Sequence, residues 1–164
     1  MAHERFPTTQ AVRVLRGHGV DFTHHPYAYE ERGGTEVSAR ELGVDEHAVI
    51  KTLIMEDDRK QLLIVLMHGD REVSTKNLAR FLGVKSVAAC APAVADRHSG
   101  YQVGGTSPFG TRRTMPVYAE RSIVELPYLY VNGGRRGYLV GMPPTEMLRV
   151  LKPTLVDIAV APTH

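Results

Sequence analysis

The chain has 164 residues, 43% hydrophobic and 23% charged, so it can build one full hydrophobic core without metals or disulfides. Its single cysteine, Cys90, excludes an internal disulfide and is typical of a reducing cytoplasm. No apolar run approaches the ~20 residues of a membrane span, and the first five residues lack the apolar core of a signal peptide. A net charge of +2 does not by itself indicate nucleic-acid binding. We therefore expect a cytoplasmic protein with one domain over residues 1–164.

The first half of the chain is predicted to hold short helices and one clear strand. Thr8 or Thr9 can cap a helix that runs to about Arg16. Ser38 and Glu41 have the spacing of a capping box, which places a short helix there. The remaining predicted segments are an extended stretch at 22–29, a helical turn capped by Asp45, and a strand from Leu62 to Met67 that is too continuously apolar to be half exposed.

The second half is predicted to alternate strands, turns and helices. Ser74 or Thr75 opens a helix that Gly83 closes. A tight turn is expected at 132–134, which would make 138–140 the hairpin partner of 129–131. The other predicted elements are strands at 87–90, 101–103 and 116–118, and helices at 93–97 and from Pro143 or Pro144 to about Val150. Because several strands connect through short turns, this order predicts a curved mixed sheet with helices packed outside.

Lys51 is the first candidate functional residue, because it lies within the apolar run from Val49 to Leu53. A lysine in such a run either extends its stem to reach water or meets an anionic partner. In the second case its ammonium would bind a phosphate, a carboxylate or a developing oxyanion. Both interpretations are compatible with the sequence.

The second candidate is the glycine-containing loop from Gly104 to Pro108. Its two glycines allow a ligand to approach backbone amides closely, and Pro108 fixes the exit of the turn. Its amides and the Thr106 and Ser107 hydroxyls could orient a carbonyl, although the loop could also be a simple connection. Tyr27 and Tyr29 could line the same pocket or be ordinary half-buried tyrosines.

Other catalytic chemistries find less support in the sequence. Cys90 lies among small apolar residues, which is more typical of a buried structural cysteine than of a nucleophile. The eight histidines form no H-E-x-x-H pattern and there is no Cys-x-x-Cys motif, so no metal site is expected. No P-loop sequence is present, and no cofactor is predicted.

Four separated segments of this chain resemble the YbaK/ProX family, the aminoacyl-tRNA deacylases related to the editing domain of bacterial prolyl-tRNA synthetases. They are Val49–Leu53, Lys85–Val87, Gly100–Gly110 and Tyr130–Gly137. The resemblance extends from about Phe6 to Ala159. It implies a single compact α/β domain with a strongly curved, barrel-like mixed β-sheet surrounded by helices.

The resemblance also implies an activity and a set of site residues. The activity is removal of a mischarged small amino acid from tRNA by a protein that acts in trans. Cys-tRNA(Pro) is the leading substrate, with alanyl- or other small-residue tRNAs behind it. Water or the substrate's own thiol would attack the ester, so no protein nucleophile is required. Lys51 would be the essential lysine at the 3′ end of the tRNA. The substrate-binding residues would be Tyr27, Thr52, Gly104, Gly105, Thr106, Ser107, Pro108, Asn132, Gly133 and Gly134.

Two positions depart from the cysteine-specific members of that family. Those proteins usually carry serine where this chain has Asn132, and aspartate where it has Leu139 or Val140. An asparagine can still form hydrogen bonds with a substrate. The expected partners are aminoacyl-tRNA and prolyl-tRNA synthetase, with no membrane. The alternative hypothesis is a non-catalytic module that binds aminoacyl-tRNA or a synthetase.

Overall fold

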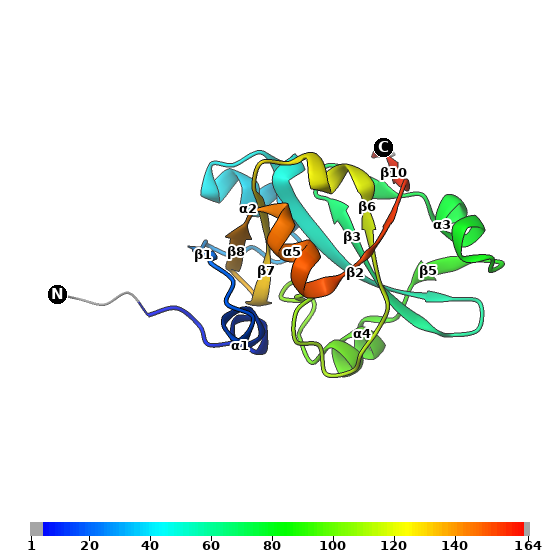
Figure 1. Ribbon diagram of the computed structural model, residues 1–164, viewed down its shortest axis with the longest axis horizontal. Helices are drawn as coiled ribbons and strands as arrows, with labels where there is room; N and C mark the ends of the chain where they lie inside the picture. Colours follow the sequence, from blue (N-terminus) through cyan, green and yellow to red (C-terminus); the bar gives the residue numbers. More distant parts are fainter. Residues whose placement is uncertain (1–4, 163–164) are drawn as a thin grey trace.

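The computed structural model describes residues 5–162, in which helices are interspersed among single strands and runs of two or three strands (Figure 1). The strands are β1 (Thr23–Pro26), β2 (Val49–Asp57), β3 (Leu62–His68), β4 (Glu72–Val73), β5 (Val87–Ala89), β6 (Val117–Glu120), β7 (Leu129–Arg135), β8 (Tyr138–Met142), β9 (Thr154–Val156) and β10 (Ala159–Val160). The α-helices are α1 (Gln10–Gly17), α2 (Gly34–Leu42), α3 (Thr75–Leu82), α4 (Pro92–Ser99) and α5 (Pro144–Leu151). Two 3₁₀ helices are η1 (Glu46–Ala48) and η2 (Arg121–Glu125).

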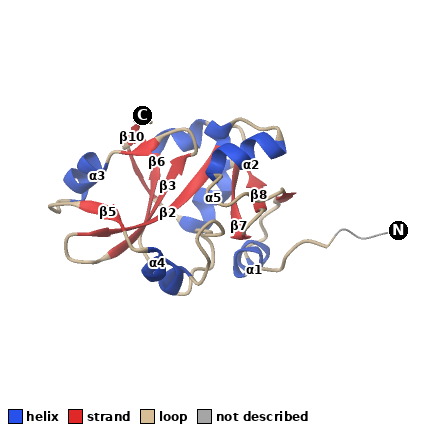
Figure 2. Cartoon of the chain, turned by 180° about the vertical axis from the view of Figure 1, so that it is seen from behind, coloured by secondary structure: helices blue, strands red, loops and turns tan. Residues whose placement is uncertain are grey.

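One eight-stranded mixed sheet organises the fold. Its order is β1-β8-β7-β2-β3-β6-β9, and β5 also pairs with β2. The β2/β7, β3/β6 and β6/β9 pairs are parallel and the others are antiparallel. Figure 2 shows β2 and β3 through the middle of the sheet, with β5 near one end of β2 and β7 near the other. The predicted mixed sheet with helices packed around it is confirmed.

The central strand β3 is buried on both faces, as its continuous apolar sequence predicts. Ile64 and Leu66 pack into the larger core, which also includes Leu15 of α1. Leu63 and Val65 point to the other face and pack into a smaller core that includes α3. Because successive side chains of a strand point to opposite faces, only a run without polar residues can supply both cores.

The helix ends follow the capping residues in most cases. Thr9 accepts a hydrogen bond from the Val12 amide, and Ser74 accepts one from the Asn77 amide, so both predicted N-caps are present. The predicted capping box at Ser38 is wrong. Helix α2 begins at Gly34, and the Ser38 hydroxyl instead donates to the Thr35 carbonyl oxygen from within the helix.

Two predictions in the second half of the chain need correction. Residues 101–103 form no strand; the Tyr101 hydroxyl donates to the Phe109 carbonyl oxygen, which anchors an irregular loop. The hairpin of β7 and β8 is present, but its turn lies at Arg136 and Gly137. Residues 132–135 instead form a bulge in β7, because the Asn132 side chain binds backbone amides that a regular ladder would use.

Within residues 5–162, the structure contains no helix that is both long and apolar enough to cross a membrane. The same part of the chain contains no group of three or more His, Cys, Asp or Glu residues arranged to hold a metal ion. The N-terminal residues before Arg5 and the last two residues lie outside the described part.

Candidate functional site

A large cavity lies beside β2, where the sheet divides. Strand β7 pairs with β2 at Val49 and Ile50, whereas β5 pairs with it from Met55 to Asp57. Between these two pairings β2 borders a cavity of about 810 Å³, which is large enough for a small-molecule ligand. The remaining walls come from the segment that leads into α2, from α2 itself, from β5 and α4, from the loop after α4, and from the β7–β8 hairpin.

Lys51 lines this cavity together with Gly104 and Thr106 of the glycine-containing loop. Its Nζ donates to the Arg71 carbonyl oxygen at 2.5 Å, so the half-buried ammonium is held at the turn between β3 and β4. Burial lowers the pKa of Lys51, while the carboxylates of Glu72, Glu46 and Asp70 act in the opposite direction. One hydrogen bond to a protein carbonyl leaves an ammonium two further donors for a ligand.

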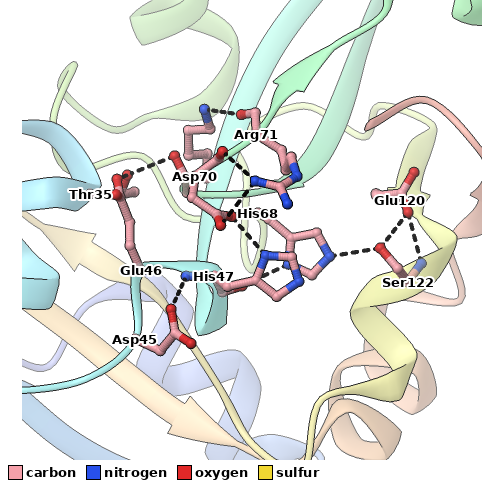
Figure 3. Close-up of polar contacts among 11 residues, drawn as sticks. Thr35, Asp45, Glu46, His47, His68, Asp70, Arg71, Glu120 and Ser122 are labelled. Carbon is pink, nitrogen blue, oxygen red and sulfur yellow. Dashed lines mark hydrogen bonds and ion pairs between the residues drawn. The ribbon is translucent and has the colours of Figure 1, made fainter. Parts of the chain in front are cut away.

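A polar cluster supports the turn that holds Lys51 (Figure 3). The Asp70 carboxylate accepts from His47 Nδ1 at 2.7 Å and from Arg71 at 3.2 Å. The His47 ring stacks on His68 with centroids 3.7 Å apart. Because Arg71 carries the carbonyl that Lys51 binds, this cluster fixes the position of the ammonium through the backbone of the turn.

The same cluster continues through the buried residues His68 and Glu120. His68 Nδ1 donates to the His47 carbonyl oxygen at 2.6 Å, and His68 Nε2 lies 2.8 Å from the Ser122 hydroxyl. Ser122 donates to Glu120 at 2.5 Å, and the chain of contacts is visible in Figure 3. Burial lowers the pKa of His68, which its bond to the His47 carbonyl opposes. These contacts connect η1, β3 and η2 and support the turn between β3 and β4.

The glycine-containing loop packs tightly against two neighbouring residues. A Cβ atom at Gly104 would lie 2.5 Å from the Tyr29 hydroxyl, and the φ of +88° at this position also favours glycine. The Asn132 amide donates to the Gly104 carbonyl oxygen at 3.2 Å, while its Oδ1 accepts from the Gly134 and Arg135 amides. Asn132 therefore joins the loop to the bulge of β7.

The structure brings together only some of the residues that the sequence predicts for the site. The cavity is lined by Tyr27, Lys51, Thr52, Gly104, Thr106 and Asn132. The lining does not include Gly105, Ser107, Pro108, Gly133 or Gly134. The Gly105 amide donates to the Gln102 carbonyl oxygen, and the buried Ser107 hydroxyl accepts from the Phe109 amide, so both groups serve the loop itself.

Comparison with known proteins identifies the family to which this chain belongs. The family described as the aminoacyl-tRNA editing domain matches residues 30–150. This chain belongs to that family. The matched range contains β2, the glycine-containing loop and the β7–β8 hairpin, which together form three walls of the cavity.

Individual relatives agree with this assignment. The chain is 25% identical over 151 residues to EbsC of Enterococcus faecalis, named as a candidate Cys-tRNA(Pro)/Cys-tRNA(Cys) deacylase, with 92% of each chain covered. It is 37% identical over 123 residues to a proline–tRNA ligase of Moorella thermoacetica, but spans only 20% of that enzyme. A crystal structure of a candidate trans-editing enzyme for prolyl tRNA synthetase aligns with a TM-score of 0.80 at 18% identity, covering 95% of this chain and all of that one. At this identity the structural match shows the fold alone.

The editing-domain cavity also includes residues that the sequence did not single out. Helix α2 contributes four of them, namely Gly34, Thr35, Val37 and Ser38. Two residues that the sequence analysis did discuss, Cys90 and Leu139 of β8, also line the cavity. No motif marks α2, because its residues reach the cavity only through the packing of the helix against β2. Burial raises the pKa of the Cys90 thiol, as does nearby Glu56, which disfavours the reactive thiolate.

Thr52 combines a place in the cavity wall with an unsatisfied side chain. Its Oγ1 is buried and has no hydrogen-bond partner among the described residues. A buried hydroxyl without a partner costs free energy, since it loses its bonds to water. We expect Thr52→Val to leave the free energy of unfolding unchanged or to raise it by up to about 1 kcal/mol, as measured by urea denaturation.

Thr35→Val provides the matched control for this measurement. The Thr35 hydroxyl contacts both a Glu46 carboxylate oxygen at 2.7 Å and the Gly69 carbonyl oxygen at 3.2 Å. Its loss should lower the free energy of unfolding by about 1–2 kcal/mol. A Thr52→Val variant as unstable as Thr35→Val would show that the Thr52 hydroxyl does stabilise the fold.

Proposed function

We propose that this protein is an aminoacyl-tRNA deacylase that removes a mischarged small amino acid, with Cys-tRNA(Pro) as its first substrate. The main support is that Lys51 and the Gly104 loop line one cavity of about 810 Å³. Membership of the editing-domain family and the name of the EbsC relative support the same chemistry. The proposal includes action in trans, on tRNA charged by a separate synthetase.

The chemistry proposed for this site needs positioning more than a protein nucleophile. An aminoacyl ester is already an activated acyl group, so orientation and stabilisation of the oxyanion can supply much of the rate. The Lys51 ammonium would hold the 3′-terminal nucleotide or the developing negative charge. The Gly104 loop and Asn132 would enclose the ester, and water or the substrate's own thiol would attack its carbonyl carbon.

Partners of this protein follow from the same proposal. Its net charge of +2 offers little non-specific attraction to the phosphates of tRNA. We therefore propose that it works in a complex with prolyl-tRNA synthetase, which would present the mischarged tRNA. Co-sedimentation of the two proteins with tRNA at physiological salt tests this, and the lack of a ternary complex would count against it.

One feature of the cavity favours a second function. Both the NH₂ group and the oxygen of the Asn132 side chain form hydrogen bonds with the protein backbone. Leu139 places an apolar side chain in the cavity wall. Neither residue supplies a free charged group toward a ligand. A non-catalytic module that binds aminoacyl-tRNA or a synthetase is compatible with this wall. It would show saturable binding of tRNA without cleavage of any aminoacyl ester.

A deacylation screen distinguishes the two functions. The purified protein is incubated with tRNA charged with Cys, Ala, Ser, Thr or Pro, and loss of the labelled amino acid is followed with time. Cleavage of at least one ester above the buffer rate supports the deacylase and names its substrate. Binding without cleavage across the whole panel would support the second function.

Cys90→Ala tests whether a protein thiol takes part. Because Cys90 is buried and its pKa is raised, we expect this variant to deacylate the preferred substrate at a rate within about twofold of the wild type. The measurement is the single-turnover rate on that tRNA. A loss of 100-fold or more, with an unchanged circular dichroism spectrum, would instead indicate a cysteine nucleophile.

A further inference from the structure

The register of the sheet leaves one residue of β2 with free backbone groups beside the cavity. The Gly69 amide donates to the Val49 carbonyl oxygen, and the Asp57 amide donates to the Gln61 carbonyl oxygen. In an antiparallel pair such bonds recur at every second residue. The odd-numbered residues of β2 therefore bond with β3, and the even-numbered residues direct their N–H and C=O groups to the opposite edge.

Two neighbouring strands occupy that opposite edge only in part. Strand β7 stops pairing with β2 after Ile50, because the bulge beginning at Asn132 bends β7 away. On the other side of the cavity, the Cys90 amide donates to the Ile54 carbonyl oxygen, and β5 pairs onward from Met55. Thr52 lies between these partners. Within residues 5–162 the register gives no partner to its N–H or C=O on this edge.

The free groups of Thr52 form a donor and an acceptor directed to the same side. This is the pair of groups with which one residue of an antiparallel strand exchanges two hydrogen bonds with the residue opposite. An extended ligand can use such an edge in the manner of an added strand. A single α-aminoacyl group offers a matching donor and acceptor, because its ammonium and carbonyl flank one carbon atom.

We propose that the open edge at Thr52 binds the aminoacyl group of the substrate, an inference that rests on the deacylase function proposed above. The α-ammonium donates to the Thr52 carbonyl oxygen, and the ester carbonyl oxygen accepts from the Thr52 amide. Lys51 and Leu53 direct their side chains to the opposite face of β2 from Thr52, so the edge remains open between them. The Thr52 amide also polarises the ester carbonyl, which favours attack on its carbon atom.

Amide hydrogen exchange measured by NMR on the intact protein tests this inference. The probe is 3′-deoxy-3′-(L-alanylamino)adenosine, whose amide link resists cleavage. The matched control is the 3′-propionylamino compound, which lacks the α-ammonium. In the free protein the Thr52 amide should exchange much faster than that of Leu53, whose ladder partner is Val65. The alanyl compound should slow exchange at Thr52 at least about tenfold and bind at least about tenfold more tightly than the propionyl compound.

Each outcome of this experiment has a defined meaning. Equal protection of Thr52 and Leu53 in the free protein would overturn the inference, since the edge would already be satisfied. So would unchanged Thr52 exchange, or equal affinity for the two compounds, in a protein that cleaves aminoacyl-tRNA; the proposed function would then stand without this binding mode. If the protein neither cleaves any aminoacyl-tRNA nor binds the alanyl compound, the proposed function fails and the inference fails with it.

Discussion

Replacing Lys51 by alanine is expected to reduce single-turnover deacylation of the preferred aminoacyl-tRNA at least about 100-fold, because the variant loses the positive charge in the cavity wall. The overall fold should remain intact. The lysine is only half buried, and its ammonium donates to the Arg71 carbonyl oxygen, which water can satisfy in the variant. The measurement combines the deacylation rate with thermal unfolding. Lys51→Arg should recover little activity, since a planar guanidinium does not reproduce the compact ammonium.

Lys60→Ala is the matched control for this prediction. Lys60 lies in the turn between β2 and β3, with an 80% exposed side chain and a surface ion pair to Glu56. Its removal takes away the same charge without touching the cavity, so the deacylation rate should change by less than about twofold. A Lys51→Ala variant as active as Lys60→Ala on every charged tRNA of the panel would show that the assigned role of Lys51 is wrong.

Local sequence signals predicted the elements that depend on local contacts. Thr9, Asp45 and Ser74 cap helical segments where the sequence places them, because each side chain accepts a hydrogen bond from an amide two or three residues along. The apolar run of β3 could likewise be read from composition alone. The capping box at Ser38 was wrong because the same short motif can occur inside a helix, where the hydroxyl binds a carbonyl of the preceding turn.

The misplaced turn in the second half has a long-range cause. Asn132-Gly133-Gly134 has the composition of a tight turn, but the Asn132 amide reaches Gly104, which is 28 residues away in sequence. This contact and the bonds to two amides hold the segment as a bulge, and the turn moves to Arg136 and Gly137. A motif read in isolation cannot include such a partner.

The candidate site could be predicted only where its residues lie in distinctive motifs. Lys51 stands out as a charge in an apolar run, and Gly104 belongs to a glycine pair, so both were found. The residues of α2 carry no comparable signal, because helix and cavity meet only in the folded chain. The open edge at Thr52 arises from the pairing of three strands that lie far apart in sequence, so only the register reveals it.

Glu120→Gln is expected to lower the free energy of unfolding at pH 7 by roughly 2–4 kcal/mol. The residue is only 5% exposed. One carboxylate oxygen accepts from the Ser122 amide and hydroxyl, and the other accepts from the Ile158 and Ala159 amides. A glutamine would turn its NH₂ group toward one of these sets of donors and leave them unsatisfied. Urea denaturation of both proteins measures the difference.

The difference in free energy of unfolding between the wild type and Glu120→Gln should depend on pH, because Glu120 titrates differently in the folded and unfolded states. Burial alone would raise the pKa of Glu120, but the bonds from Ser122, Ile158 and Ala159 lower it below the usual value of 4.5. A carboxyl group whose pKa is lower in the folded state stabilises the protein fully above its unfolded pKa. That stabilisation is lost as the pH falls through the folded pKa. The stability gap between wild type and Glu120→Gln should therefore be widest near pH 7 and narrow steadily below about pH 4.5.

Asp157→Asn separates this effect from the general loss of a carboxylate. Asp157 pairs with Arg121 next to the same cluster, but its side chain is 77% exposed. An exposed ion pair contributes little, so this variant should differ from the wild type by less than about 0.5 kcal/mol at pH 7. If the gap for Glu120→Gln were the same at pH 4 and pH 7, Glu120 would not act as a buried carboxylate held by backbone amides. The contacts that support the Lys51 turn would then be stabilised by packing alone. The hydrogen bonds from the Ile158 and Ala159 amides to the ionised Glu120 would contribute nothing to the free energy of unfolding.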